Sequence, residues 1–75
     1  MNVAMITGRQ EAMAALAEGF ARNGFRSECF AMGPHWFEDF KAHRWELAIL
    51  DGRSVPFREV AEQILEADAR LNMAV

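Results

Sequence analysis

The stretch "ELAILDGRSVPF", residues 46–57, decides the fold. Within it, residues 47–50 form a short apolar run that ends at Asp51, and residues 52–56 then make a loop. An apolar run of this length, bounded by turn residues, is typical of a strand buried on both faces of a parallel sheet. We therefore predict a strand that starts at Trp45 or Glu46 and carries Asp51 at its carboxyl end.

The residues before this stretch alternate between strand and helix patterns. Residues 2–7 form a similar apolar run that stops at Gly8, and residues 25–32 predict a weaker strand nearer a sheet edge. Between them, from Gln10, the helical period places four apolar side chains on one predicted buried face: Met13, Leu16, Ala17 and Phe20. Asn23-Gly24 is a stop signal for this helix.

Two more helices are predicted later in the chain. The first is short, has Pro34 in its first turn, and buries Trp36, Phe37 and Phe40. The second covers residues 57–71, and its predicted buried face is Phe57, Val60, Ala61, Ile64 and Leu65. Residues 73–75 then begin another apolar run.

The element order β-α-β-α-β-α, followed by the start of a fourth strand, predicts a single α/β domain over residues 1–75. Such an order indicates a flavodoxin-like, three-layer open parallel sheet with helices on both faces. A sheet that ends in a newly begun strand leaves unpaired edge groups. We expect the chain to be about two thirds of a longer domain, or to complete its sheet by self-association through the C-terminal strand as a homodimer. The alternative is a short edge strand or a frayed tail.

Composition narrows the class of protein. The 75 residues are 52% hydrophobic, which excludes a disordered segment, and the net charge is −3 with scattered basic residues, which argues against a nucleic-acid partner. Cys29 is the single cysteine, so we expect a reducing interior and a cytoplasmic location. We find no signal peptide and no apolar stretch long enough to cross a membrane.

The candidate site lies where the strands end. In an open parallel sheet, ligands bind beyond the carboxyl ends of the strands. Three loops begin there, at Thr7, Met32 and Asp51. If the first and third strands are neighbours, Asp51 converges with the following site candidates: Thr7, Gly8, Arg9, Gly52, Arg53 and Ser54.

These motifs resemble the receiver domain of bacterial response regulators. The resemblance rests on "NVAMITG" at residues 2–8, on "LAILD" at 47–51 with Pro56 in the following loop, and on "ILEADARLNMAV" at 64–75. It covers nearly the whole chain and about the first two thirds of a receiver. It implies a signalling module of a two-component system, and it implies that Asp51 is the phosphoacceptor of phosphorelay signal transduction.

The chain departs from the receiver pattern around Asp51. The acidic pair that the family uses to hold a divalent cation after the first strand is replaced by Gly8 and Arg9. The spacing from Asp51 to Pro56 is one residue longer than in the family, and the usual glycine after that proline is absent. The family's switch Thr or Ser and its lysine would fall after Val75. Mg²⁺ is therefore expected as a cofactor only if Asp51 is phosphorylated.

Three functions follow from these features. The first, which we favour, is a degenerate pseudo-receiver without enzymatic activity that acts by protein–protein interaction, with Arg9 paired to Asp51. The second is a phosphoacceptor receiver modified on Asp51. The third is a flavodoxin-like or amidotransferase-like fragment that binds a small ligand at the same strand ends.

Simpler interpretations of single residues also stand. Asp51 before Gly52 fits a turn acid that satisfies loop N–H groups, and Arg9 fits a solvated charge at a helix start. His35 and His43 have no Cys, Asp or Glu group to complete a metal site, so no metal ligands are predicted. The aromatic residues around Trp36 and Trp45 are predicted to lie in the core. Ser54 has no candidate base, which leaves hydrolase chemistry unsupported.

Overall fold

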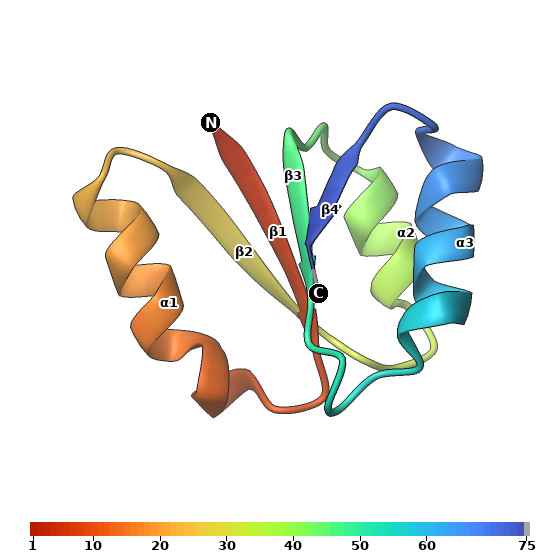
Figure 1. Ribbon diagram of the computed structural model, residues 1–75, viewed down its shortest axis with the longest axis horizontal. Coiled ribbons are helices and arrows are strands. Elements are labelled where there is room, and N and C mark those ends of the chain that lie inside the picture. The colour runs from red at the N-terminus through yellow and green to blue at the C-terminus, as the bar shows by residue number, and fades with distance from the viewer. Residues whose placement is uncertain (75) are drawn as a thin grey trace.

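The computed structural model describes residues 1–74 and contains one four-stranded, all-parallel sheet with strand order β2-β1-β3-β4 (Figure 1). The elements, in chain order, are β1 (Asn2–Thr7), α1 (Gln10–Arg22), β2 (Arg26–Ala31), α2 (Trp36–Lys41), β3 (Leu47–Leu50), α3 (Phe57–Ala67) and β4 (Asn72–Ala74). The predicted open parallel sheet, with three βα units and the start of a fourth strand, is confirmed.

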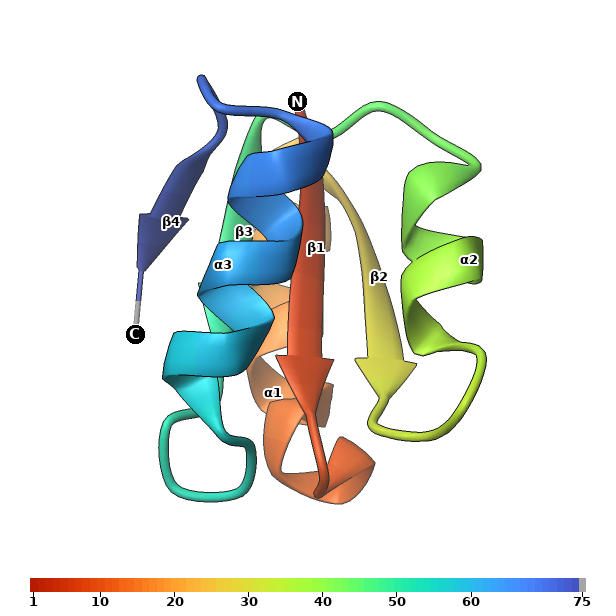
Figure 2. The same cartoon turned by 90° about the vertical axis from the view of Figure 1, so that its right-hand side faces the viewer.

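Helices cover both faces of the sheet. α1 lies on one face, and α2 and α3 lie side by side on the other (Figures 1 and 2). β1 is an inner strand, and its residues 3–7 are all buried, as expected for an apolar run without alternation. β2 is an edge strand, as its weaker pattern predicted.

Several element ends differ from the prediction. α2 begins at Trp36, so Pro34 lies in the turn before the helix and not in its first turn. α3 ends at Ala67 because Asp68 is extended and its carboxylate accepts the backbone N–H of Arg70 at 3.0 Å. A side chain that bonds to nearby backbone in this way competes with the helix. The predicted fourth strand begins at Asn72, and Val75 lies outside the described residues.

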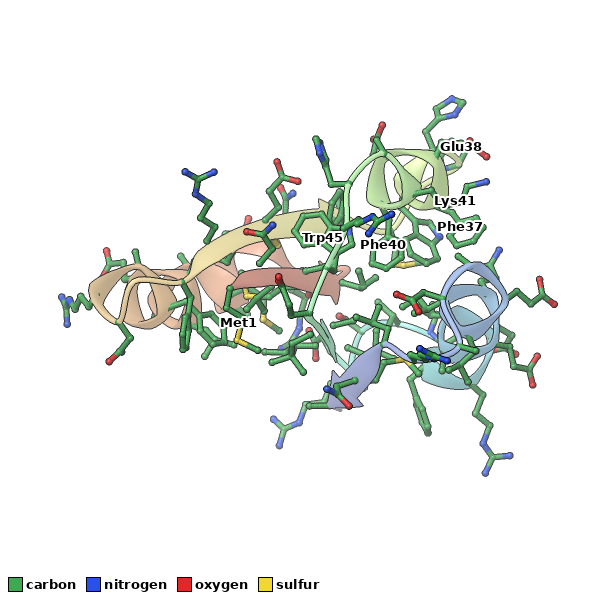
Figure 3. All side chains as sticks on the ribbon, turned by 90° about the horizontal axis from the view of Figure 1, so that it is seen from above. Met1, Phe37, Glu38, Phe40, Lys41 and Trp45 are labelled. Atoms are coloured by element: carbon green, nitrogen blue, oxygen red, sulfur yellow. The ribbon has the colours of Figure 1, made fainter. Side chains whose placement is uncertain are left out.

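The main core lies between the sheet and the pair α2 and α3. Ile6 and Leu50 point from β1 and β3 to this face and pack with Val60 and Ile64 of α3. The aromatic residues gather beneath α2, where Phe40 and Trp45 stack with ring centroids 6.0 Å apart (Figure 3). The indole Nε1–H of Trp45 donates to the carbonyl oxygen of Phe40 at 2.8 Å, which satisfies its only polar group. The predicted aromatic core is confirmed.

The face that carries α1 is less well covered. α1 has no fully buried residue, and Leu16, predicted to be buried, is 40% exposed. The reason is that α1 packs on β1 and β2, while Leu47 and Ile49 of β3 lie on the same face beyond it and are half-buried. Phe57 and Leu65 of α3 were also predicted to be buried, but they are 40% and 42% exposed. Only Val60 and Ile64 are buried on that helix.

α1 ends as its sequence predicted. Gly24 has φ of +80°, and its N–H donates to the carbonyl of Ala21, while the N–H of Phe25 donates to the carbonyl of Phe20. These two bonds form a Schellman motif. The Phe20 and Phe25 rings add the hydrophobic contact that accompanies it, with centroids 5.9 Å apart.

Within residues 1–74, no helix has both the length and the apolar character needed to cross a membrane.

Candidate functional site

Parallel pairing of β1 and β3 brings the predicted site together. Ile6 lies opposite Leu50, so the next residues, Thr7 and Asp51, lie side by side where the two strands end. The backbone N–H of Asp51 continues the ladder by donating to the carbonyl of Ile6 at 2.9 Å. The β1–α1 and β3–α3 loops therefore meet at the carboxyl ends of the strands, at the bottom of Figure 1. The first and third strands are neighbours, which is the condition under which the predicted site residues converge.

The Asp51 carboxylate is buried, with 7% of the residue exposed, and is surrounded by donors. Oδ2 accepts from the hydroxyl of Ser54 at 2.6 Å and from the hydroxyl of Thr7 at 2.8 Å. Oδ1 accepts the backbone N–H of Arg53 at 3.2 Å. Both carboxylate oxygens therefore accept hydrogen bonds from uncharged donors, in addition to the ion pair described next.

Arg9 adds an ion pair to this carboxylate. Its Nη2 lies 3.0 Å from Oδ2 and 3.1 Å from Oδ1, and its Nε lies 3.2 Å from Oδ2. The Asp51 side chain is 6% exposed and the Arg9 side chain 49% exposed, so the guanidinium lies over the carboxylate at the surface. Charge-assisted bonds of this kind are among the strongest that a surface arginine makes.

The two hydroxyls also accept backbone N–H groups of the β1–α1 loop, and the hydroxyl of Ser54 thereby joins the two loops. The Thr7 Oγ1 accepts the backbone N–H of Arg9 at 2.9 Å, and the Ser54 Oγ accepts the backbone N–H of Gly8 at 2.9 Å. A side chain at residue 8 would meet the β3–α3 loop, because a Cβ there would lie 3.1 Å from the carbonyl oxygen of Ser54. Gly8 therefore allows the close approach of the loops that Ser54 needs.

These contacts fix the charge state of Asp51. The hydrogen bond from Ser54, followed by those from Thr7, Arg9 and Arg53, holds the pKa of the carboxyl well below its usual range, and burial opposes this shift without reversing it. Asp51 is therefore a carboxylate at every physiological pH.

The structure brings together most of the predicted site residues. Thr7, Arg9 and Ser54 contact Asp51 with their side chains, and Arg53 contacts it through its backbone. Gly8 contacts the site through Ser54. Gly52 lies beside the carboxylate without a hydrogen bond to it among residues 1–74.

The turn-acid interpretation of Asp51 is also supported, since its side chain accepts a loop N–H and its carbonyl accepts those of Ser54 and Val55. The same carboxylate thus holds the loop and pairs with Arg9.

Sequence reasoning missed two features of the site. It named Ser54 as a site residue but did not predict that Ser54 makes the shortest hydrogen bond to Asp51. The available signal was the spacing of three residues, because a Ser hydroxyl at this spacing can reach back to an Asp at the start of a turn. It also missed three apolar side chains that line a hollow beside the carboxylate: Met13, Ile49 and Phe57. They come from three separate elements, so no local pattern joins them.

The residues around Asp51 do not fit a divalent cation. Mg²⁺ prefers several hard oxygen ligands, usually including carboxylates and waters. Here the neighbours of the carboxylate are the guanidinium of Arg9 and two hydroxyls that already donate to it. In the described part of the chain, no group of three or more His, Cys, Asp or Glu side chains is placed to hold a metal ion.

Cys29 lies on β2, opposite Met5 of β1, and is half-buried. Burial raises the pKa of its thiol, which disfavours the reactive thiolate at neutral pH.

Comparison with protein-family models, with curated proteins and with solved structures finds no match to this chain.

Proposed function

We propose that this chain is a degenerate, receiver-like signalling module of two-component type that acts in the cytoplasm by binding another protein, and that Asp51 holds its binding surface together in place of accepting a phosphoryl group. The observation that carries the proposal is the two-pronged ion pair between Arg9 and Asp51 at the carboxyl end of the sheet.

The ion pair bears directly on the chemistry of phosphorylation. A carboxylate that attacks a phosphoryl donor needs a free lone pair and an open approach, and the negative charges of the two reactants must be neutralised by a cation. Oδ2 of Asp51 already accepts bonds from Ser54, Thr7 and Arg9. The half-exposed Arg9 side chain is paired with this carboxylate, and the Asp51 side chain is only 6% exposed. These contacts favour an ionic anchor over a nucleophile.

The same contacts suit a binding surface. The network of Thr7, Arg9, Asp51 and Ser54 ties the β1–α1 loop to the β3–α3 loop, and with them the first turns of α1 and α3. A surface fixed in this way loses little conformational entropy when a partner binds. In this proposal, Asp51 occupies the position of the receiver phosphoacceptor but serves to hold the two loops together.

Phosphorylation of the intact chain tests the proposal. The protein is incubated with acetyl phosphate and Mg²⁺, and its intact mass is measured beside that of an active receiver domain as positive control. We expect the control to gain a phosphoryl group and this chain to keep its mass. A phosphoryl adduct that is lost in Asp51→Asn would overturn the proposal and establish the phosphoacceptor function.

A second variant identifies the cause. Arg9→Asp removes the guanidinium and places an acid where receivers carry one of their cation ligands. We expect Mg²⁺ to perturb the Asp51 and Arg53 amide resonances in Arg9→Asp and to leave them unchanged in the unsubstituted chain. Arg58→Asp, which makes the same change of charge at an exposed residue of α3 outside the network, is the matched control.

A further inference from the structure

A shallow hollow of about 530 Å³ opens beside the Arg9–Asp51 pair. It lies at the carboxyl ends of the strands, where the β3–α3 loop turns toward α3. Its lining residues are mainly of two kinds, the basic residues Arg9 and Arg53 and the apolar residues Met13, Ile49, Leu50 and Phe57. The volume is enough for one amino-acid side chain with its adjoining backbone.

The charged wall has an excess of positive charge. Two basic residues, Arg9 and Arg53, line the hollow, and Asp51 is the one acidic residue among its lining residues. Arg9 uses Nε and Nη2 on Asp51, which leaves its Nη1 without a partner among residues 1–74. The Arg53 guanidinium likewise makes no ion pair in this part of the chain. The residues that line the hollow therefore carry one net positive charge.

Two helix ends strengthen this potential. α1 begins directly after Arg9, and α3 begins at Phe57, so both N-termini lie at the same edge of the sheet as the hollow. Neither helix has a side-chain cap, and the acid in each first turn, Glu11 in α1 and Glu59 in α3, is exposed. The partial positive charge of a helix N-terminus favours an anion.

The apolar wall limits which anion fits. Met13 and Ile49 are half-buried, and Phe57, the first residue of α3, is 40% exposed. All three therefore have apolar surface that a ligand can cover. A small and fully hydrated anion, such as inorganic phosphate, would leave these apolar side chains exposed to water. An anion joined to an apolar group would bury the wall and meet a guanidinium at once.

We propose that this hollow binds the apolar C-terminal residue of a partner polypeptide, with its terminal carboxylate on Arg53 and the free Nη1 of Arg9 and its side chain against Ile49 and Phe57. In a C-terminal residue the carboxylate and the apolar side chain leave the same Cα, and this matches two kinds of wall within one small hollow. The inference rests on the proposed function, because Arg9 must stay paired with Asp51 to hold its position.

The probes are three short peptides: acetyl-Gly-Ala-Leu with a free carboxylate, the same peptide as its C-terminal amide, and acetyl-Leu-Asp-Gly amide, whose only acid is internal. Each is titrated into ¹⁵N-labelled protein at up to millimolar concentration, and amide shifts are followed. We expect the first peptide to shift Arg9, Arg53 and Phe57 in a saturable way. The amide and the internal-acid peptide should bind about tenfold more weakly or not detectably, since each lacks the terminal charge.

Matched variants locate the contact. Arg53→Gln should weaken binding of the free-carboxylate peptide about tenfold, while Arg58→Gln, which makes the same charge change outside the hollow, should not. Phe57→Ala should weaken it severalfold, while Leu65→Ala, which truncates an equally exposed residue of the same helix, should not. A well-dispersed spectrum confirms that each variant is folded.

The proposal is overturned if the free-carboxylate peptide causes no saturable shift at the hollow, if either other peptide binds as tightly, or if the control variants lose as much affinity as their partners. These outcomes are separate from failure of the proposed function. The titration contains no phosphoryl donor, so phosphorylation of Asp51 in the mass experiment leaves its result readable.

Discussion

Asp51 shows how one side chain serves two needs at a strand end. Its carboxylate accepts the backbone N–H of Arg53, which shapes the loop, and the hydroxyls of Thr7 and Ser54, which join that loop to the end of β1. Because Asp51 is buried, removal of one hydrogen-bond donor leaves its negative charge less well stabilised. The donors are therefore expected to matter for stability as well as for binding.

Ser54→Ala tests the weight of the shortest of these bonds. The substitution removes the donor to Asp51 and the acceptor of the Gly8 N–H. We expect the free energy of unfolding to fall by about 1–2 kcal/mol in urea denaturation. Ser27→Ala is the control, because Ser27 is also half-buried and its hydroxyl makes no hydrogen bond within residues 1–74. Equal losses in the two variants would contradict the assignment.

The lowered pKa of Asp51 predicts a dependence of stability on pH. An unfolded chain protonates an aspartate near pH 4, whereas the folded chain resists protonation to lower pH. The stability that Asp51 contributes is therefore complete above about pH 4 and is lost as the pH falls below that value toward the folded-state pKa. Urea denaturation of the parent and of Asp51→Asn from pH 6 to pH 3 measures this difference in unfolding free energy. The difference should shrink below pH 4, and a constant difference would show that Asp51 has an ordinary pKa.

At the scale of the element, how α1 ends matters for its stability, because none of its residues is fully buried. Its Schellman motif needs residue 24 at φ +80°, which a side chain disfavours, whereas a Cβ added at Gly19, within the helix, would meet no atom within 4 Å. The two glycines therefore have opposite roles in the same helix.

We expect Gly24→Ala to destabilise the protein by about 1 kcal/mol and Gly19→Ala to stabilise it by about 0.5–1 kcal/mol. Gly33→Ala is the control, since it has open space around it and no positive φ, and its effect should be small. Thermal unfolding followed by circular dichroism ranks the variants. Destabilisation by Gly19→Ala would indicate a close contact on α1 that the structure lacks.

At the scale of the whole molecule, the sheet of residues 1–74 has β2 and β4 as its edge strands, and its α1 face is only partly covered at β3. β4 is an edge strand, and beside it Leu47 and Ile49 on the α1 face are only half-buried. An edge strand next to apolar surface is a site at which another chain can add to the sheet.

We propose that the chain self-associates through β4 and expect dimers in light scattering at high micromolar concentration. Ala74→Lys should shift the equilibrium to monomer, because a charged side chain on an edge strand opposes pairing. Ala31→Lys makes the same change on β2, at the other edge, and should leave the dimer intact. A clean monomer for the unsubstituted chain would remove this proposal.

The sequence alone determined the order and type of the elements and the place of Asp51 at the end of β3. These features follow from local patterns: buried strands read as continuous apolar runs, helices as a 3.6-residue period, and Gly24 as a stop. On the condition that β1 and β3 are neighbours, they also predicted that Thr7, Arg9 and Ser54 gather near Asp51, because neighbouring parallel strands end together.

Only the tertiary structure decided how deeply each side chain is buried and what Asp51 contacts. Leu16 and Phe57 carry the helical period of buried residues and are yet 40% exposed, because burial depends on which face a second helix covers. The bonds that Thr7 and Arg9 make to Asp51 cross more than forty residues of chain, and their lengths depend on the register of β1 and β3. A sequence pattern contains no information on which part of a sheet face a helix covers, or on the distance between two loops.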